Sequence, residues 1–232
     1  FRADKSHTPY HVAEFWQIEP EVAFCDLDGI MDIAEDLVKY VIKYTLDHAK
    51  DEMEYLDKYV EKGLIDRLTK VLTCDFKRVP YKECIDILKK SGKDFEFKPE
   101  YGSDIAKEHE KYLTDYFKCP FFLTMWPKEL KSFYMKQMPD GTVAGADLEM
   151  PGIGEVFGMS QREEDLDKLV SRMKELDMKI EEYEWYIKLR KYGTCERSGF
   201  GIGFERLLMY ITGIDSIKDV TPYPRVHKSC DY

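Results

Sequence analysis

Apolar residues recur every three or four positions in the first third of the chain, from Leu27 to about Leu72. This spacing places them on one helix face, so the stretch predicts helices that bury a shared stripe. Residues 51–63 are rich in charge and predict either a solvated helix or a break, with Gly63 as a stop signal. The stripe consists of Ile30, Ile33, Ala34, Leu37, Val38, Val41, Ile42 and Leu46.

The same periodicity and shorter apolar runs predict the remaining elements. Residues 79–88, 104–117, 163–178, 183–190 and 205–212 are expected to be helical. Apolar runs predict a buried strand at 120–124 and the start of another at 133–135. We interpret the aromatic residues of 183–187 as packing groups, since aromatic stripes at helical spacing usually cover a sheet.

A glycine-alternating run, Gly199-Phe200-Gly201-Ile202-Gly203, leads directly into Arg206 at the head of a helix that ends at Gly213. Alternate glycines leave one strand face bare, so that a flat ligand can approach the backbone. Arg206 can bind phosphate oxygens beside a helix N-terminus. The spacing matches neither the dinucleotide fingerprint nor the nucleotide P-loop. Two interpretations stay open at this point, a phosphate site or a glycine-weakened core strand with a surface arginine.

A second polar block lies at the other end of the chain. Residues 1–6 and 13–21 predict two strands joined by a loop through His11. Arg2 and His11 are cations and Phe15 offers an aromatic face, so together with Arg206 they can grip phosphate and stack a base. The alternative is an ordinary surface hairpin in a highly charged protein.

Composition limits the classes of function. The 232 residues predict a single domain, and no apolar run approaches the roughly 18 residues of a membrane helix. The net charge of −10 excludes a general, non-specific nucleic-acid binder, although local cations such as Lys5, His7 and His11 can still meet a limited stretch of RNA. We therefore expect no membrane contact.

Cysteine and histidine spacing argues against a zinc site. The six cysteines form no Cys-x-x-Cys pair and do not cluster with histidines. Glu108 and Glu110 flank His109, but neighbouring helical positions point to different faces, which favours a salt network over a metal site. We expect thiols in a reducing compartment and hence a cytoplasmic protein. The cysteines are Cys25, Cys74, Cys84, Cys119, Cys195 and Cys230.

Taken together, the two polar blocks resemble motifs 2 and 3 of the class II aminoacyl-tRNA synthetases, and within that class the asparaginyl-tRNA synthetases. Further segments resemble the same family in its order along essentially the whole chain: Pro127–Met135, Asp147–Glu155, Ser160–Glu163 and Arg190–Thr194. The resemblance implies an α+β class II catalytic fold, a central antiparallel sheet flanked by helices. It also implies that 1–232 is the C-terminal portion of the catalytic domain, with a helical insertion at about 47–75.

Motif 1, which precedes motif 2 in the family, and the N-terminal anticodon-binding domain have no counterpart in this sequence. The resemblance therefore predicts a C-terminal fragment whose activity in isolation is in question. For the full-length protein it implies a homodimer, with ATP, asparagine and tRNA(Asn) as substrates and Mg²⁺ accompanying ATP. The expected product of the first step is asparaginyl-adenylate.

By resemblance, Arg2 and Arg206 are the catalytic residues that neutralise phosphate charge. The ATP site implied by the family comprises Arg2, Asp4, His11, Phe15, Glu155, Gly203 and Arg206. Glu155 is the main Mg²⁺ ligand and Asp147 the second, because hard carboxylate oxygens and ATP phosphates complete the shell of this ion. We place Asp147 at a strand end, and Glu149 can be either a ligand or a loop acid.

Two residues are assigned to asparagine itself. The family places at Arg162 the arginine that holds the amino-acid substrate, where a guanidinium can donate two parallel bonds. Glu14 is the candidate acceptor for the side-chain NH₂, since a carboxylate there welcomes an amide and repels the second carboxylate of aspartate. The sequence departs from the family at Tyr10, usually arginine, and at Asp4, usually glutamate. The loss of the loop arginine puts γ-phosphate binding by the loop in doubt.

Alternatives stay open on the same framework. They are an aspartyl-tRNA synthetase, a tRNA-independent asparagine synthetase, and a non-catalytic module that retains the fold.

Overall fold

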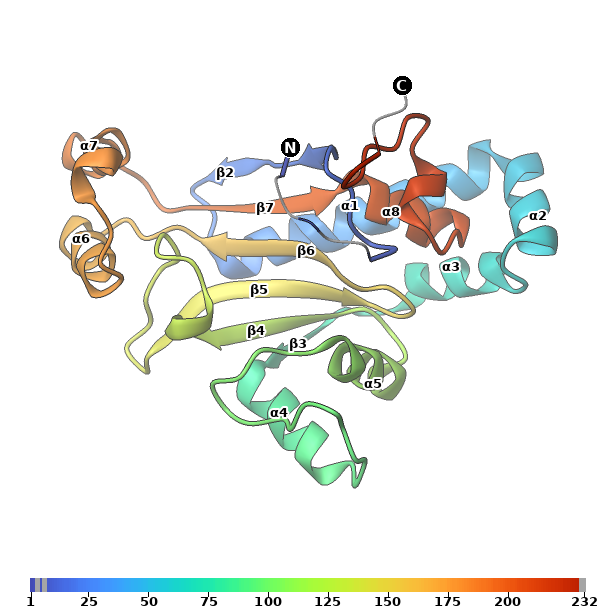
Figure 1. Cartoon of the computed structure of the whole chain (residues 1–232), viewed down its shortest axis with the longest axis horizontal. Coiled ribbons are helices and arrows are strands. Elements are labelled where there is room, and N and C mark those ends of the chain that lie inside the picture. The colour runs from blue at the N-terminus through green and yellow to red at the C-terminus, as the bar shows by residue number, and fades with distance from the viewer. Residues whose placement is uncertain (3–4, 6–7, 230–232) are drawn as a thin grey trace.

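The computed structural model describes residues 1–2, 5 and 8–229. A seven-stranded sheet runs through the middle of the molecule in the order β1-β7-β6-β5-β4-β3, with β2 also paired to β7 (Figure 1). All pairs are antiparallel except β3 with β4. The expectation of a central antiparallel sheet flanked by helices is confirmed, with one parallel pair at its edge. The strands are β1 (Gln17–Ile18), β2 (Glu21–Ala23), β3 (Lys77–Pro80), β4 (Phe121–Pro127), β5 (Thr142–Met150), β6 (Gly154–Gln161) and β7 (Arg197–Gly203).

Helices cover the sheet and its ends. Figure 1 shows α1 behind β5, β6 and β7, α4 and α5 below the β3 edge, and α6 with α7 beyond one end of the strands. The helices are α1 (Leu27–His48), α2 (Lys50–Tyr59), α3 (Leu64–Thr73), α4 (Tyr81–Lys90), α5 (Lys107–Phe117), α6 (Leu166–Glu175), α7 (Glu184–Lys191) and α8 (Phe204–Thr212). No helix of the described part of the chain is long and apolar enough to cross a membrane.

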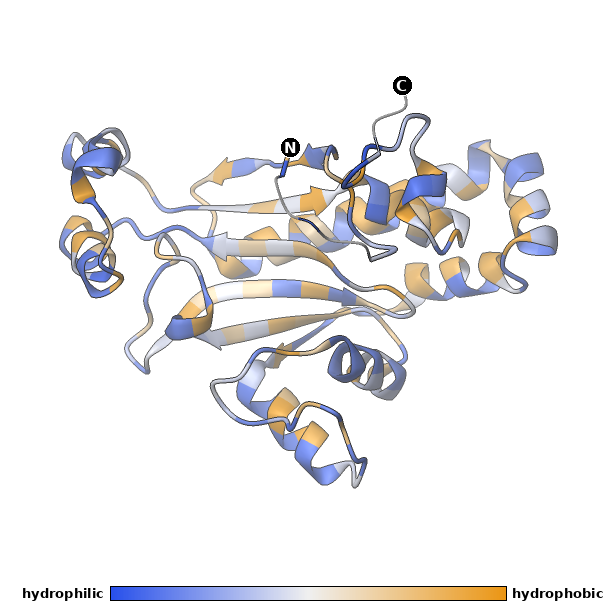
Figure 2. Cartoon of the chain, viewed as in Figure 1, coloured by the Kyte–Doolittle hydropathy of each residue, from blue (hydrophilic) through white to orange (hydrophobic). Residues whose placement is uncertain are grey.

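The main core lies between α1, α3 and the inner face of the sheet. Ile30, Ala34, Val38 and Ile42 are buried there at four-residue spacing, as the predicted stripe requires, whereas Ile33 is exposed. Figure 2 shows the matching alternation of hydrophobic and hydrophilic positions along α1. Asp26 begins the helix by accepting a hydrogen bond from the Gly29 amide, which is a standard N-cap.

The helical stretch expected at 47–75 contains α2 and α3, so the charged segment forms a helix and the break falls at Gly63, which has a φ of 88°. Leu64, Leu68 and Val71 of α3 join the main core. That this stretch is an insertion stays a prediction. A second core under β3 and β4 packs α4 and α5.

Several local predictions were wrong. Residues 133–135 start no strand and contribute one isolated bridge, Met135 to Arg162. The helix predicted to begin at Val79 begins instead at Tyr81. Residues 77–80 form a strand, and its last residue, Pro80, is the N-cap of α4. Of the strand expected at 1–6, only Phe1, Arg2 and Lys5 are described, and they lie in no strand.

The cysteine prediction also needs correction. Cys74 at the end of α3 and Cys119 before β4 form a disulfide, whereas the sequence reading expected thiols throughout. Cys25, Cys84 and Cys195 are free, and Cys230 lies outside the described residues. Spacing alone did not reveal the pair, because the two cysteines are 45 positions apart.

The salt network predicted for this helix is present, but the His109 ring bonds mainly to backbone groups. The ring is buried, its Nδ1 accepts from the Ala106 amide, and its Nε2 bonds the Phe97 carbonyl at 2.8 Å. Ion pairs on this helix join Lys107 to Glu110 at 2.6 Å and Lys111 to Asp115 at 3.1 Å. His109 therefore caps α5 and anchors the preceding loop.

Candidate active site

The bare face of β7 forms the floor of a cavity of about 720 Å³. Gly201, Gly203 and Gly158 of the neighbouring strand line it, as expected of a strand that lets a ligand approach the backbone. A side chain at Gly199 would place its Cβ 2.5 Å from the Glu21 carboxylate and 2.7 Å from the Arg162 guanidinium. Only glycine leaves room for that pair.

Most of the predicted site residues come together around this cavity. Those that line it are Arg2, His11, Phe15, Asp147, Glu155, Arg162, Gly203 and Arg206. Residues from the first and last parts of the chain thus meet at one place, which the sequence analysis required for a nucleotide site. Asp4, the remaining predicted ATP contact, lies outside the described residues.

Backbone pairing holds the N-terminal block against the β7–α8 junction. The Trp16 amide donates to Glu205 at 2.9 Å, and the Phe204 amide donates to the Trp16 carbonyl at 3.0 Å. These bonds fix Phe15 beside the first turn of α8. The Arg2 guanidinium lies 5.7 Å from the Phe15 ring centroid, within cation–π range.

Arg206 extends from the first turn of α8 to the start of β6, where its Nη1 donates to the Glu155 carbonyl at 3.1 Å. The helix ends at Gly213 in the left-handed conformation, with a φ of 72°, as predicted. Arg206 thus stands at the positive end of a short helix, next to a predicted metal ligand. This arrangement suits phosphate oxygens.

The loop between residues 8 and 13 closes the same end of the cavity. Thr8 Oγ1 bonds His11 Nδ1, and the Ile217 amide donates to the Pro9 carbonyl at 2.9 Å. Tyr10, at the position where the family usually has arginine, lines the cavity and packs against the small core of Val12 and its neighbours. An apolar anchor therefore replaces a cation at this point of the loop.

The opposite end of the cavity is built around Arg162. Its Nε donates to Glu21 Oε1 at 2.9 Å, its Nη1 bonds Ser160, and its guanidinium lies 5.2 Å from the Tyr134 ring centroid. Gly199, beside this pair, and Gly203, beside Arg206, are four residues apart on β7, a span of about 13 Å.

The assignment of Glu14 is corrected by this geometry. Glu14 is ion-paired with Arg225 at 2.8 Å and does not line the cavity. Glu21, which the sequence reading missed, pairs with Arg162 instead. Glu21 stands opposite Gly199 in the antiparallel register and Gln17 stands opposite Gly203, a register that no local sequence pattern supplies.

Asp147 and Glu155 converge on the bare position of Gly158. A Cβ there would lie 3.6 Å from Glu155 Oε1 and 3.7 Å from Asp147 Oδ1, so one small space faces both carboxylates. Asp147 lies inside β5 and not at a strand end, contrary to the prediction, with Glu155 on the paired strand. The hard oxygen donors fit Mg²⁺. No group of three metal-ligating side chains occurs among the described residues, so phosphate or water would have to supply most ligands of such an ion.

Burial dominates the electrostatics of these acids. It raises the pKa of Asp147 to about 7, with the charge of Glu155 adding to the rise and the Lys131 ammonium opposing it. Burial also raises the pKa of Glu149 well above its usual value, and the nearby Glu110 and Asp147 add to that. Glu149 does not line the cavity, so it lies behind Asp147 and Glu155, the two predicted metal ligands. Its buried Oε2 has no hydrogen-bond partner.

A mixed sheet with a glycine floor, cations at one end and an arginine–glutamate pair at the other is the arrangement expected of a class II synthetase. The chain belongs to the family of class II tRNA synthetases (D, K and N), which matches residues 1–227. Its relatives point further within that family. The asparagine–tRNA ligase of Bacillus cytotoxicus is 52% identical over 234 residues, covering 100% of this chain and 50% of that protein.

Solved structures agree with the sequence relatives. Asparaginyl-tRNA synthetase from Pyrococcus horikoshii, complexed with asparaginyl-adenylate, matches with a TM-score of 0.88 and 39% identity over 98% of this chain and 51% of that one. The Entamoeba histolytica asparaginyl-tRNA synthetase, also in complex with asparaginyl-adenylate, gives a TM-score of 0.88 and 34% identity over 100% of this chain and 52% of that one. The chain thus spans about half the length of the relatives it matches.

Proposed function

We propose that this protein activates asparagine with ATP and passes it to tRNA(Asn), as part of an asparagine–tRNA ligase. One observation carries the proposal. The Arg162–Glu21 pair and the Arg206 guanidinium occupy two ends of one glycine-floored cavity, with Asp147 and Glu155 in its wall. The floor between Gly199 and Gly203, about 13 Å long, suits an amino acid joined to a nucleotide.

The amino-acid end fits a carboxamide. Arg162 donates toward the side-chain carbonyl oxygen, while Glu21 accepts from the NH₂ group and repels the second carboxylate of aspartate. Glu19, with Oε1 3.6 Å from the Cβ position of Gly201, adds negative charge on the same face for the α-ammonium. This arrangement favours asparagine over aspartate.

The phosphate end supports in-line attack. An oxygen of the asparagine carboxylate attacks the α-phosphorus, the bond to the bridging oxygen breaks, and pyrophosphate leaves with both electrons of that bond. Arg2 neutralises the charge that develops on the α-phosphate, and Arg206 with His11 holds the β- and γ-phosphates. Phe15 and Arg206 stack the adenine. The protein supplies position and charge, with no covalent nucleophile.

Glu155 and Asp147 would hold Mg²⁺, which neutralises phosphate charge when bound with ATP.

In the second step a ribose hydroxyl at the tRNA 3′ end attacks the acyl carbonyl and AMP leaves. Lys5, an exposed cation, contributes positive charge toward the acceptor end. We propose a homodimer for the full-length protein. The cytoplasmic location stays a prediction. It was based on free thiols, and the Cys74–Cys119 disulfide weakens that basis.

The test is asparagine-dependent exchange of pyrophosphate into ATP, compared with aspartate and repeated with and without tRNA. Exchange with asparagine and charging of tRNA support the proposal. A preference for aspartate would identify an aspartyl enzyme, and amide formation without tRNA would identify an asparagine synthetase. If neither this chain nor the full-length protein gives heat on titration with ATP and Mg²⁺, the fold serves as a non-catalytic module.

A further inference from the structure

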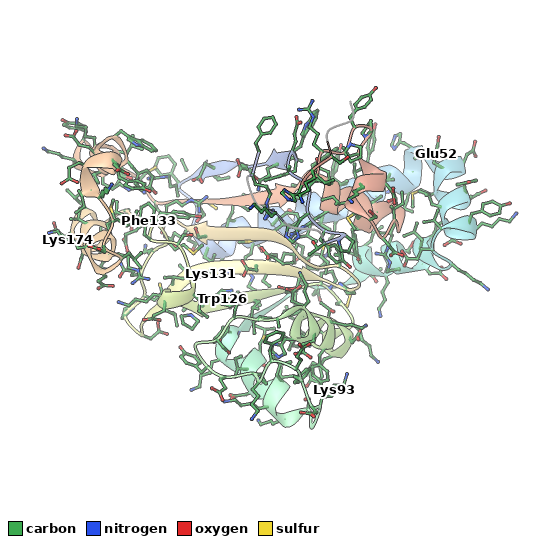
Figure 3. The ribbon with its side chains drawn as sticks, viewed as in Figure 1. Glu52, Lys93, Trp126, Lys131, Phe133 and Lys174 are labelled. Carbon is green, nitrogen blue, oxygen red and sulfur yellow. A yellow bond between two sulfur atoms is a disulfide. The ribbon has the colours of Figure 1, made fainter. Side chains whose placement is uncertain are left out.

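Lys131 occupies a fixed place in the cavity wall that the reaction just described does not use. Its ammonium pairs with Oδ2 of Asp147 and lies 4.0 Å from the Trp126 ring centroid. Figure 3 labels Lys131 and Trp126 side by side, in front of the sheet. The side chains of Lys131 and Asp147 are only 18% and 9% exposed, so water screens this pair weakly.

The two oxygens of Asp147 face different neighbours. Oδ2 contacts the lysine ammonium, whereas Oδ1 faces the bare position of Gly158, where Glu155 Oε1 also points. The Lys131 ammonium therefore contacts one oxygen of the Asp147 carboxylate, and the expected metal position faces the other oxygen. A carboxylate whose charge is already offset by an ammonium attracts a second cation less strongly.

We propose that Lys131 is the resident counter-cation of this metal site and makes Mg²⁺ binding depend on the nucleotide. With Lys131 in place, the two carboxylates carry too little net charge to hold a free divalent ion. ATP brings further oxygen ligands and negative charge, which offset the ammonium. The inference rests on the Mg²⁺ site of the proposed function, but it concerns metal affinity and not turnover.

The decisive measurement is calorimetric titration of Mg²⁺ alone into nucleotide-free protein. Lys131→Gln is expected to bind Mg²⁺ at least about tenfold more tightly than the unmodified protein, because a positive charge close to the ion is removed. Lys131→Arg retains the charge and should remain at the unmodified affinity. Lys136→Gln is the matched control, since Lys136 follows in the same connection but pairs with Glu164 at 3.0 Å.

An increased affinity is a readout that a merely structural lysine would not give, since damage to the site lowers metal binding. The proposal is overturned if Lys131→Gln binds Mg²⁺ no more tightly than the unmodified protein, or if Lys136→Gln gains as much. If the glutamine variant does not fold, Lys131→Met replaces it in the same titration, because it keeps an apolar side chain against Trp126. If neither folds, Lys131 is structural and the proposal fails. Pyrophosphate exchange by the unmodified protein tests the proposed function separately.

Discussion

Glu21 and Arg162 are 141 positions apart in the chain and form one ion pair in the cavity, with Arg162 Nε 2.9 Å from Glu21 Oε1. The pair places a hydrogen-bond donor and an acceptor side by side. That is the complement of a carboxamide, whose oxygen accepts and whose nitrogen donates.

Replacing Glu21 with glutamine should weaken discrimination between amino acids. The variant removes the charge that repels aspartate, so the ratio of kcat/KM for asparagine over aspartate is expected to fall about tenfold or more. The KM for ATP should change little, because Glu21 lies at the far end of the floor. Glu14→Gln is the matched control, since its Arg225 pair lies outside the cavity wall. Equal loss of selectivity in both variants would refute the assignment.

On the proposed mechanism, removal of Arg206 or Arg2 should slow activation strongly. Arg206→Ala and Arg2→Ala are each expected to reduce pyrophosphate exchange by about 10²–10³, as is typical when a pre-placed transition-state donor is lost. Arg78→Ala serves as the control, because Arg78 pairs with Asp28 and Asp32 away from the cavity. Losses below threefold for Arg206 and Arg2 would contradict the phosphate site.

The raised pKa of Asp147 predicts a stability that falls as pH increases. In the folded state this group stays protonated up to a pKa of about 7, whereas the ordinary value is 3.8. Between these values the folded state binds more protons than the unfolded state. The free energy of unfolding should therefore decrease from pH 4 toward pH 7, by up to about 1.4 kcal/mol per pH unit.

Urea unfolding at several pH values checks this expectation. Asp147→Asn should flatten the decrease, because the titration of Asp147 is lost and the pKa of Glu149, which the Asp147 charge helps to raise, is then raised less. An unchanged slope in the variant would show that Asp147 ionises normally in the fold.

The Cys74–Cys119 disulfide predicts sensitivity to reductants. The bond joins the end of α3 to the start of β4 across 45 positions, and the chain-entropy relation gives about 4 kcal/mol for a loop of that size. Reduction or Cys119→Ser should lower the midpoint of unfolding accordingly. Alkylation and mass spectrometry of the native protein should leave Cys74 and Cys119 unlabelled. A reductant that destabilises Cys119→Ser as much as the unmodified protein would rule out the bond as the cause.

Helices with regular apolar spacing were predictable from the sequence, because apolar residues at three- and four-residue spacing lie on the helix face that packs into the core. Ile30, Ala34 and Val38 illustrate this, and the exposed Ile33 shows that the width of the stripe was overestimated. The β7–α8 junction was also predictable, since alternate glycines, Arg206 and Gly213 each have a local physical reason.

Contacts that depend on strand register were harder to predict. Glu14 precedes β1 and lies where the chain has not yet joined the sheet, whereas Glu21 begins β2 opposite Gly199. A choice between two glutamates seven positions apart requires the register, which no local pattern supplies. Lys131 was missed for a related reason, because its partner Asp147 lies across a connection without regular structure. The disulfide likewise joins positions that only the folded chain brings together.

The pairing of Gln17 with Gly203 has a consequence for synthesis on the ribosome. β1 and β2 form their described strand pairs with β7 alone, and β7 is translated roughly ten to forty seconds later at common elongation rates. A nascent chain therefore carries an unmatched N-terminal segment during most of its production, while α1 and the middle strands can already collapse. The cavity lined by both ends of the chain is then completed late, so non-local pairing sets the pace of maturation.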